Sequence, residues 1–216
     1  RYPGPPREAL VALCERVARF GMKLSVIEGY LPHGDIVRGG PARERQLESW
    51  QQLLMNMGEC GVPVCCYNFM PGEDWTRTDV ADGDRADGLT SERLWENLAW
   101  LLERLVPLAE AAGVKLAMHP DDPPLPRLAG HEQIMGSVEA FEKLVRLVPS
   151  PANGICFCQG SFAEMGVDVP TTIRLLGRHI HYVHFRDIRG HADDFYETFH
   201  DDGQTDMLQA MGAYRE

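Results

Sequence analysis

Three side chains that commonly bind transition metals stand at the ends of predicted strands: His119, Cys158 and His184. The run 115–118 is short and apolar and follows a helix-length segment that ends at Gly113, which is typical of a buried strand. His119 comes next. Several prolines follow it, and because proline has no backbone N–H, the chain must leave the sheet directly after the histidine.

Four of the five predicted strands end in a polar or coordinating residue: Glu28, His119, Cys158 and His184. The corresponding ends of parallel strands meet at one edge, so these side chains are expected to converge. Two imidazoles and one thiolate suit Fe, Mn, Co, Ni or Zn better than Mg or Ca. Each residue alone is more often an ordinary buried side chain, and only the joint placement predicts a metal site.

The elements that would position these residues alternate along the chain. Helical spacing predicts helices over 7–20, 42–57, 91–112, 137–147 and 170–176, with a last helical piece within 201–214. Strands are expected at 23–27, 62–69, 115–118, 153–158 and 180–184. Connections of helix length between strands indicate a parallel α/β sheet.

Two fold classes share this pattern, the doubly wound sheet and the (β/α) TIM barrel. No G-x-G-x-x-G follows a strand, which removes the main signal for a dinucleotide-binding sheet. A complete barrel needs about 250 residues. The chain begins at Arg1 without Met and stops inside a predicted helix. We therefore expect a fragment: one domain over 1–216, a partial barrel with five to six of eight strands.

Composition narrows the range of partners. The net charge of -11 and the pI near 5.2 argue against nucleic-acid or anionic-membrane partners, because like charges repel. The six cysteines fall mostly in apolar strand-like runs, with no signal peptide or membrane-spanning run. These features predict a cytoplasmic protein with free thiols.

Five segments resemble the mannonate dehydratase family, in the same order along the chain. They are CYNFMPGEDWTRTD (66–79), KLAMHPDDPP (115–124), NGICFCQGS (153–161), HYVHFRDIRG (181–190) and FHDDGQTDM (199–207). The resemblance implies a xylose isomerase-like barrel that dehydrates D-mannonate to 2-keto-3-deoxy-D-gluconate in glucuronate catabolism, with Mn²⁺ or Fe²⁺. It also implies that His119, Cys158 and His184 are the metal ligands.

Five residues are predicted to bind the substrate: Asn68, Trp75, Arg77, Asp122 and Arg186. A guanidinium matches a carboxylate with two parallel hydrogen bonds, which favours Arg186 for the acid group. Arg77 is equally well explained as part of a surface ion pair. The family's Asp/His motif, with a fourth ligand and a catalytic histidine, is expected beyond Glu216, so the catalytic residues are unknown.

Two alternatives remain open. A sugar isomerase or epimerase on the same barrel would need carboxylate-rich metal positions, and Glu28 is the only other strand-end carboxylate in the predicted set. An inactive remnant or structural subunit would bind no metal. For the enzyme, the expected partner is a small sugar acid, and a homodimer is one possible assembly.

Overall fold

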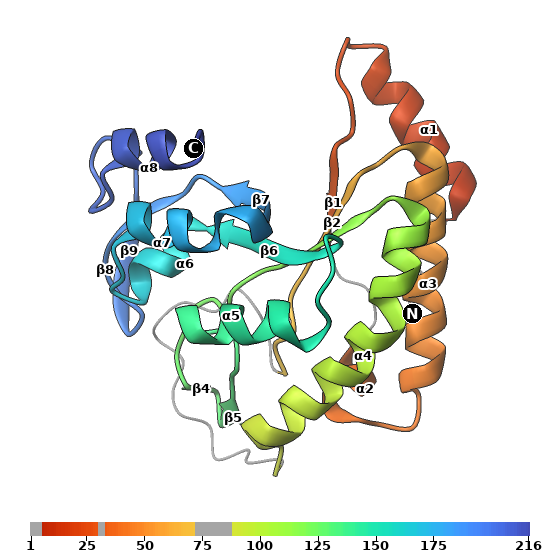
Figure 1. The fold of residues 1–216 in the computed structure, drawn as a ribbon, viewed down its shortest axis with the longest axis horizontal. Coiled ribbons are helices and arrows are strands. Elements are labelled where there is room, and N and C mark those ends of the chain that lie inside the picture. Colours follow the sequence, from red (N-terminus) through yellow and green to blue (C-terminus); the bar gives the residue numbers. More distant parts are fainter. Residues whose placement is uncertain (1–5, 30–32, 72–87) are drawn as a thin grey trace.

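The computed structural model describes residues 6–29, 33–71 and 88–216. Its centre is a parallel sheet with the strand order β1-β2-β3-β6-β7. The sheet forms part of a (β/α) barrel and leaves β1 and β7 as its edges (Figure 1). The strands are β1 (Val26–Glu28), β2 (Val64–Tyr67), β3 (Lys115–Met118), β6 (Asn153–Cys158) and β7 (Ile180–His184). The predicted α/β fold with five parallel strands is confirmed.

Helices connect the strands and cover the outer side of the sheet (Figure 1). They are α1 (Arg7–Ala18), α2 (Gly34–Arg38), α3 (Arg43–Cys60), α4 (Ser91–Ala112), α5 (Val138–Leu147), α6 (Gln159–Glu164), α7 (Val169–Leu176) and α8 (Met207–Ala213). Local sequence sets the ends of α4. The Thr90 side chain accepts a hydrogen bond from the Arg93 backbone N–H, and Gly113 ends the helix in a left-handed conformation.

The two faces of the sheet pack differently. On the outer face, strand side chains such as Leu116 and Phe157 join one large buried cluster with helix side chains such as Leu98. The inner face carries a smaller cluster of Val64, Cys66, Ala117 and Cys156, with Val26 and Tyr182 beside it. Because side chains alternate along a strand, Cys65 and Cys66 fall on opposite faces, as their adjacency predicts.

Helix α3 is longer than the sequence pattern indicates. We predicted a stop near Gly58, but the helix continues to Cys60 and ends at Gly61, whose φ of 68° is left-handed. A Cβ on Gly58 would overlap with the backbone oxygen of Ala112. Gly58 therefore allows α3 to pass close to the end of α4. In the sequence, a glycine required for this close packing looks the same as a glycine that ends a helix.

Several short elements were not predicted. They are the helices α2 and α6, the pair β4 (Arg127–Leu128) and β5 (His131–Glu132), and the antiparallel hairpin of β8 (Asp187–His191) and β9 (Asp194–Thr198). Two strands are also shorter than expected, since β1 begins at Val26 and β2 ends at Tyr67. The hairpin matters most here, because it begins directly beyond the end of β7.

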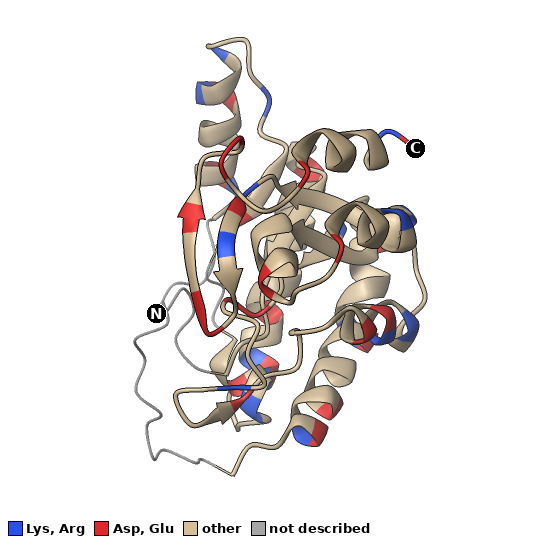
Figure 2. Ribbon diagram, turned by 90° about the vertical axis from the view of Figure 1, so that its left-hand side faces the viewer, with Lys and Arg blue, Asp and Glu red and all other residues tan. Residues whose placement is uncertain are grey.

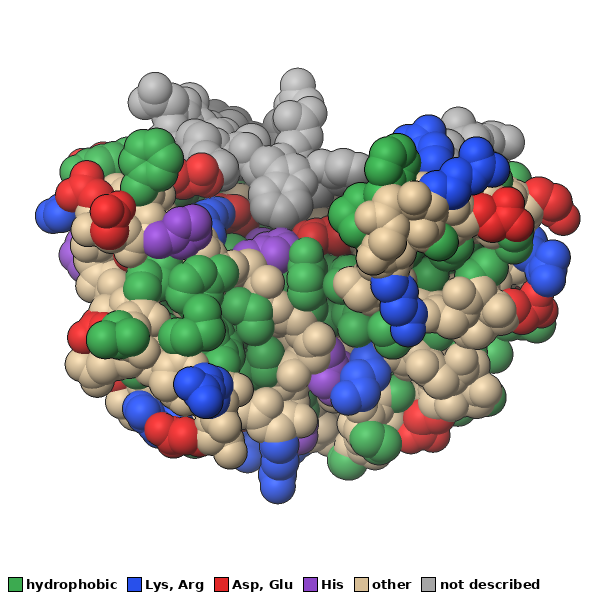
Figure 3. Space-filling view, turned by 90° about the horizontal axis from the view of Figure 1, so that it is seen from above, with side chains coloured by type: hydrophobic (Ala, Val, Ile, Leu, Met, Phe, Trp, Pro, Cys, Tyr) green, Lys and Arg blue, Asp and Glu red, His purple; other side chains and the backbone are tan. Residues whose placement is uncertain are grey.

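The surface carries mixed charge. Figure 2 shows the positions of Asp and Glu along the ribbon of the hairpin and the helices, with positions of Lys and Arg interspersed. On the face shown in Figure 3, hydrophobic side chains gather beside histidines. All six cysteines are free thiols, as predicted. Among the described residues, no helix combines the length and apolar character needed to cross a membrane.

Candidate metal centre

The predicted ligands continue the inner face of the sheet beyond its apolar cluster. His119, Cys158 and His184 each lie two positions after an inward residue, namely Ala117, Cys156 and Tyr182. Cys158 and His184 are also register partners on β6 and β7. Because successive side chains of a strand point to opposite faces of the sheet, all three side chains point to its inner face, at the carboxyl ends of their strands.

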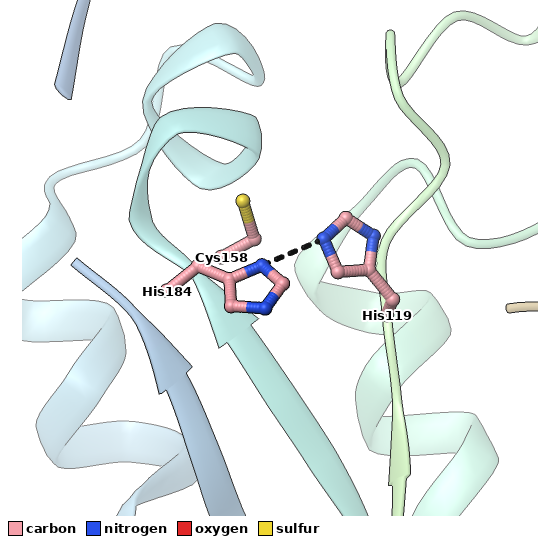
Figure 4. A group of neighbouring side chains, drawn as sticks. All are labelled: His119, Cys158 and His184. Carbon is pink, nitrogen blue, oxygen red and sulfur yellow. Dashed lines mark hydrogen bonds between the residues drawn. The ribbon is translucent and has the colours of Figure 1, made fainter. Parts of the chain in front are cut away.

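The three side chains meet (Figure 4). One ligand atom from each of His119, Cys158 and His184 lies within 4.8 Å of the other two. The shortest approach joins His119 Nε2 and His184 Nδ1, which are 3.1 Å apart. His119 and Cys158 are buried and His184 is partly exposed, so the group opens toward solvent on one side.

In each imidazole, the nitrogen that points away from the site is held by an oxygen atom. His119 Nδ1 lies 2.7 Å from the carbonyl oxygen of Pro120, and His184 Nε2 lies 2.9 Å from Glu28 Oε2. A carbonyl or carboxylate oxygen accepts a hydrogen bond, so these two nitrogens carry the protons. His119 Nε2 and His184 Nδ1 face each other and would be the coordinating atoms once a metal displaces any proton between them. Metal-binding histidines are oriented by partners of this kind.

The Cys158 thiolate and each of the two imidazoles stabilise the charged form of one another. Burial disfavours the Cys158 thiolate, but hydrogen bonds from His119 and His184 outweigh burial and lower its pKa to about 5. Burial also opposes protonation of His184, yet its bonds to Cys158 and Glu28 raise its pKa to about 10. The pKa of His119 is raised as well, since Cys158 and Pro120 outweigh its burial. Cys158 is thus a thiolate at neutral pH.

The group fits a divalent transition metal. Two nitrogen ligands at about 2.1 Å from one ion lie about 3.0 to 3.4 Å apart, and the 3.1 Å between His119 Nε2 and His184 Nδ1 falls in this range. A thiolate with two imidazoles is a donor set for Mn, Fe, Co, Ni or Zn rather than Ca. The His119, Cys158 and His184 side chains would hold the ion, and Glu28 would orient His184 from behind.

Metal affinity is expected to rise with pH. In the metal-free protein His184 holds a proton up to a pKa of about 10, and the ion must displace it. Cys158, with a pKa of about 5, is already deprotonated at neutral pH. Release of the His184 proton alone predicts about tenfold tighter binding per pH unit between pH 6 and 8, and the raised pKa of His119 makes this slope steeper. Metal titrations at pH 6.5 and 7.5 would measure this, and equal affinities would contradict it.

Three of the five predicted substrate-binding residues lie in the described part of the chain. Asn68 follows β2 and is partly buried, with its Oδ1 3.4 Å from the backbone nitrogen of Met70. Asp122 and Arg186 lie beyond β3 and β7 and bind each other, with 2.8 Å between Oδ2 and Nη1. Trp75 and Arg77 lie outside the described residues.

Two further residues of the site were not assigned a role from sequence. Glu28 stood out only as a strand-end carboxylate, and its contact with His184 depends on the approach of β1 and β7 across the barrel interior. Glu164 is a buried carboxylate at the end of α6 and forms an ion pair with Arg186. No local sequence pattern distinguishes Glu164, because helix-end glutamates are common on protein surfaces.

The fold and the site together define a class: (β/α)-barrel proteins with a candidate metal site at the carboxyl ends of the strands. A family model described as D-mannonate dehydratase (UxuA) matches residues 6–90 and 84–216. The mannonate dehydratase of Thermotoga petrophila is 34% identical over 268 residues, covering 98% of this chain and 74% of the relative. That of Shouchella clausii is 31% identical over 265 residues, with the same coverage.

A solved structure of a mannonate dehydratase has a closely similar fold. The mannonate dehydratase from Streptococcus suis serotype 2 superposes with a TM-score of 0.89 at 33% identity, covering 97% of this chain and 68% of that one. A D-tagatose 3-epimerase-like protein has a TM-score of 0.72 at 16% identity, covering 99% of this chain and 73% of that one, which shows a shared fold alone. The chain belongs to the mannonate dehydratase family, a family of hydro-lyases.

Proposed function

We propose that this protein removes one water from D-mannonate to form 2-keto-3-deoxy-D-gluconate, with a divalent metal bound by His119, Cys158 and His184. The observation that carries the proposal is the meeting of these three ligands within 4.8 Å, in a chain of the mannonate dehydratase family. The donor set supports a first-row transition metal, and we propose Mn²⁺ or Fe²⁺.

A metal in this position would polarise the sugar acid and stabilise the negative charge that develops when the proton next to the carboxylate is removed. The protein's part is to prepare the ligands. Glu28 and the Pro120 carbonyl fix the two imidazole rings, so His119 Nε2 and His184 Nδ1 point into the site. The neighbouring imidazoles keep Cys158 as a thiolate. The acid that assists departure of the C3 hydroxyl is not assigned.

Substrate contacts are proposed for the residues at the same end of the barrel. Asn68, Asp122 and Arg186 follow three of the strands, at the end of the barrel where a sugar acid beside the metal would lie. We propose the same role for Trp75 and Arg77. A substrate carboxylate at Arg186 would share its guanidinium with Asp122 and Glu164, so this contact would be weaker than at an unpaired arginine.

The test is a dehydration assay of the purified protein with Mn²⁺ and D-mannonate. We expect an α-keto acid whose mass is one water below that of the substrate. D-Gluconate, which differs from D-mannonate only in configuration at C2, serves as the matched control and is expected to react more slowly. A protein that binds the metal but forms no keto acid from D-mannonate would refute the proposal.

A further inference from the structure

Arg186 lies between two buried carboxylates. Its Nη1 donates to Asp122 Oδ2 at 2.8 Å, and its Nη2 donates to Glu164 Oε1. Both carboxylate side chains are 0% exposed and Arg186 is 18% exposed. Glu197 of the hairpin adds a longer contact of 3.8 Å from a half-exposed position. Buried ion pairs of this kind hold their partners in a fixed geometry, because a separated buried charge costs several kcal/mol.

The three residues of this ion-pair group each belong to the segment that follows a metal ligand. Asp122 comes three residues after His119, Glu164 comes six after Cys158, and Arg186 comes two after His184. One guanidinium therefore joins the three chain segments that leave the three ligand-bearing strands. We call Asp122, Glu164 and Arg186 the arginine clamp.

The clamp also touches the chain next to Cys158. A Cβ on Gly160 would overlap with the Arg186 guanidinium, so the guanidinium lies directly against the first turn of α6. That turn begins one residue after Cys158. The position of the guanidinium and the position of the Cys158 backbone are thus linked by direct packing.

We propose that the arginine clamp is a positioning device that keeps His119, Cys158 and His184 at coordinating distance from one another. This inference rests on the proposed metal site. Neither Asp122 nor Glu164 would touch the ion. Each instead holds Arg186, which connects the three strand ends from outside the ligand shell. Residues that orient metal ligands in this way typically change metal affinity by about 10- to 100-fold when they are replaced.

The test is metal affinity rather than activity. Glu164→Gln keeps the size of the side chain and removes its charge from the clamp. We expect Co²⁺ to bind this variant about 10- to 100-fold more weakly than the unsubstituted protein, with altered thiolate-to-cobalt absorption because Cys158 is displaced. Glu142→Gln is the matched control. Glu142 pairs with Arg146 at 3.0 Å on the exposed side of α5, so Co²⁺ affinity should not change.

A second variant keeps the test decisive if Glu164→Gln does not fold. Gly160→Ala retains every charge, and alanine suits the helix, but its methyl group would push the Arg186 guanidinium out of place. It is expected to weaken Co²⁺ binding in the same direction. If the folded variants bind Co²⁺ within about twofold of the unsubstituted protein, the clamp is refuted while the metal site stands. If the unsubstituted protein binds no Co²⁺, the metal site and the clamp both fail.

Discussion

His119→Ala is expected to abolish metal binding and to lower dehydratase activity by about 10³-fold or more, since the ion supplies the main charge stabilisation of the proposed reaction. His119 is the buried imidazole of the site, and its Nε2 faces His184 Nδ1 at 3.1 Å. Without it, two side-chain ligands from the described residues remain, too few for a stable site. Metal content by elemental analysis and keto-acid formation would measure both effects.

The matched control is His179→Ala. His179 lies just before β7, at the amino end of a strand that carries a ligand at its carboxyl end. Removing it leaves His119, Cys158 and His184 in place, so metal content and activity should be retained. Circular dichroism would establish that both variants are folded. Full activity in a folded His119→Ala variant would show that the reaction does not depend on this site.

Removing the metal with a chelator is expected to eliminate activity, and adding Mn²⁺ or Fe²⁺ is expected to restore it. The reason is the ligand chemistry: a thiolate and two imidazoles bind such ions well and bind Ca²⁺ poorly, because Ca²⁺ prefers six to eight oxygen ligands. Ca²⁺ should therefore not restore the reaction. The measurement is the rate of keto-acid formation from D-mannonate before chelation, after it, and after each ion is added back.

A Cys158 variant tests how much the thiolate contributes to metal binding. Cys158→Ser keeps a side chain of similar shape and replaces the thiolate with a neutral hydroxyl. It should need a higher Mn²⁺ or Fe²⁺ concentration for the same activity, because the charge that Cys158 contributes at neutral pH is lost. If the chelated protein is shown to be metal-free and keeps its full activity, the expected effects of chelation and of Cys158→Ser are both contradicted. The reaction would then depend on side chains alone.

The longer helices, the five strands of the sheet and the three candidate ligands could be recognised from local patterns. Strand β6 was predicted with its observed bounds, because a short apolar run between turn signals is a strong strand signal. The hairpin of β8 and β9 was missed, since most of its residues are exposed or half-buried and carry no clear alternation of polar and apolar side chains. Its residues are stabilised by pairing and by packing on α6, which local propensity does not encode.

The contacts of the predicted substrate-binding residues with one another could not be predicted from the sequence. Asp122 and Arg186 were each predicted to contact the sugar acid, and both lie at the expected end of the barrel. The sequence did not indicate that they bind each other, or that Glu164 binds the same guanidinium. Their substrate contacts stay predictions, and the role that the structure adds to them is the arginine clamp.

The sequence by itself determined the parallel α/β fold and the three residues that could bind a metal, because these depend on residue type and on periodicity along the chain. The family was indicated by a different signal, the resemblance of five segments in the same order along the chain. The tertiary structure decided which nitrogen of each histidine faces the site, how the Cys158 thiolate is stabilised and what holds Arg186. These features depend on pairs such as Glu28 with His184, which are 156 residues apart in the chain. Only folding sets their distance and burial, and with them the strength of each charge.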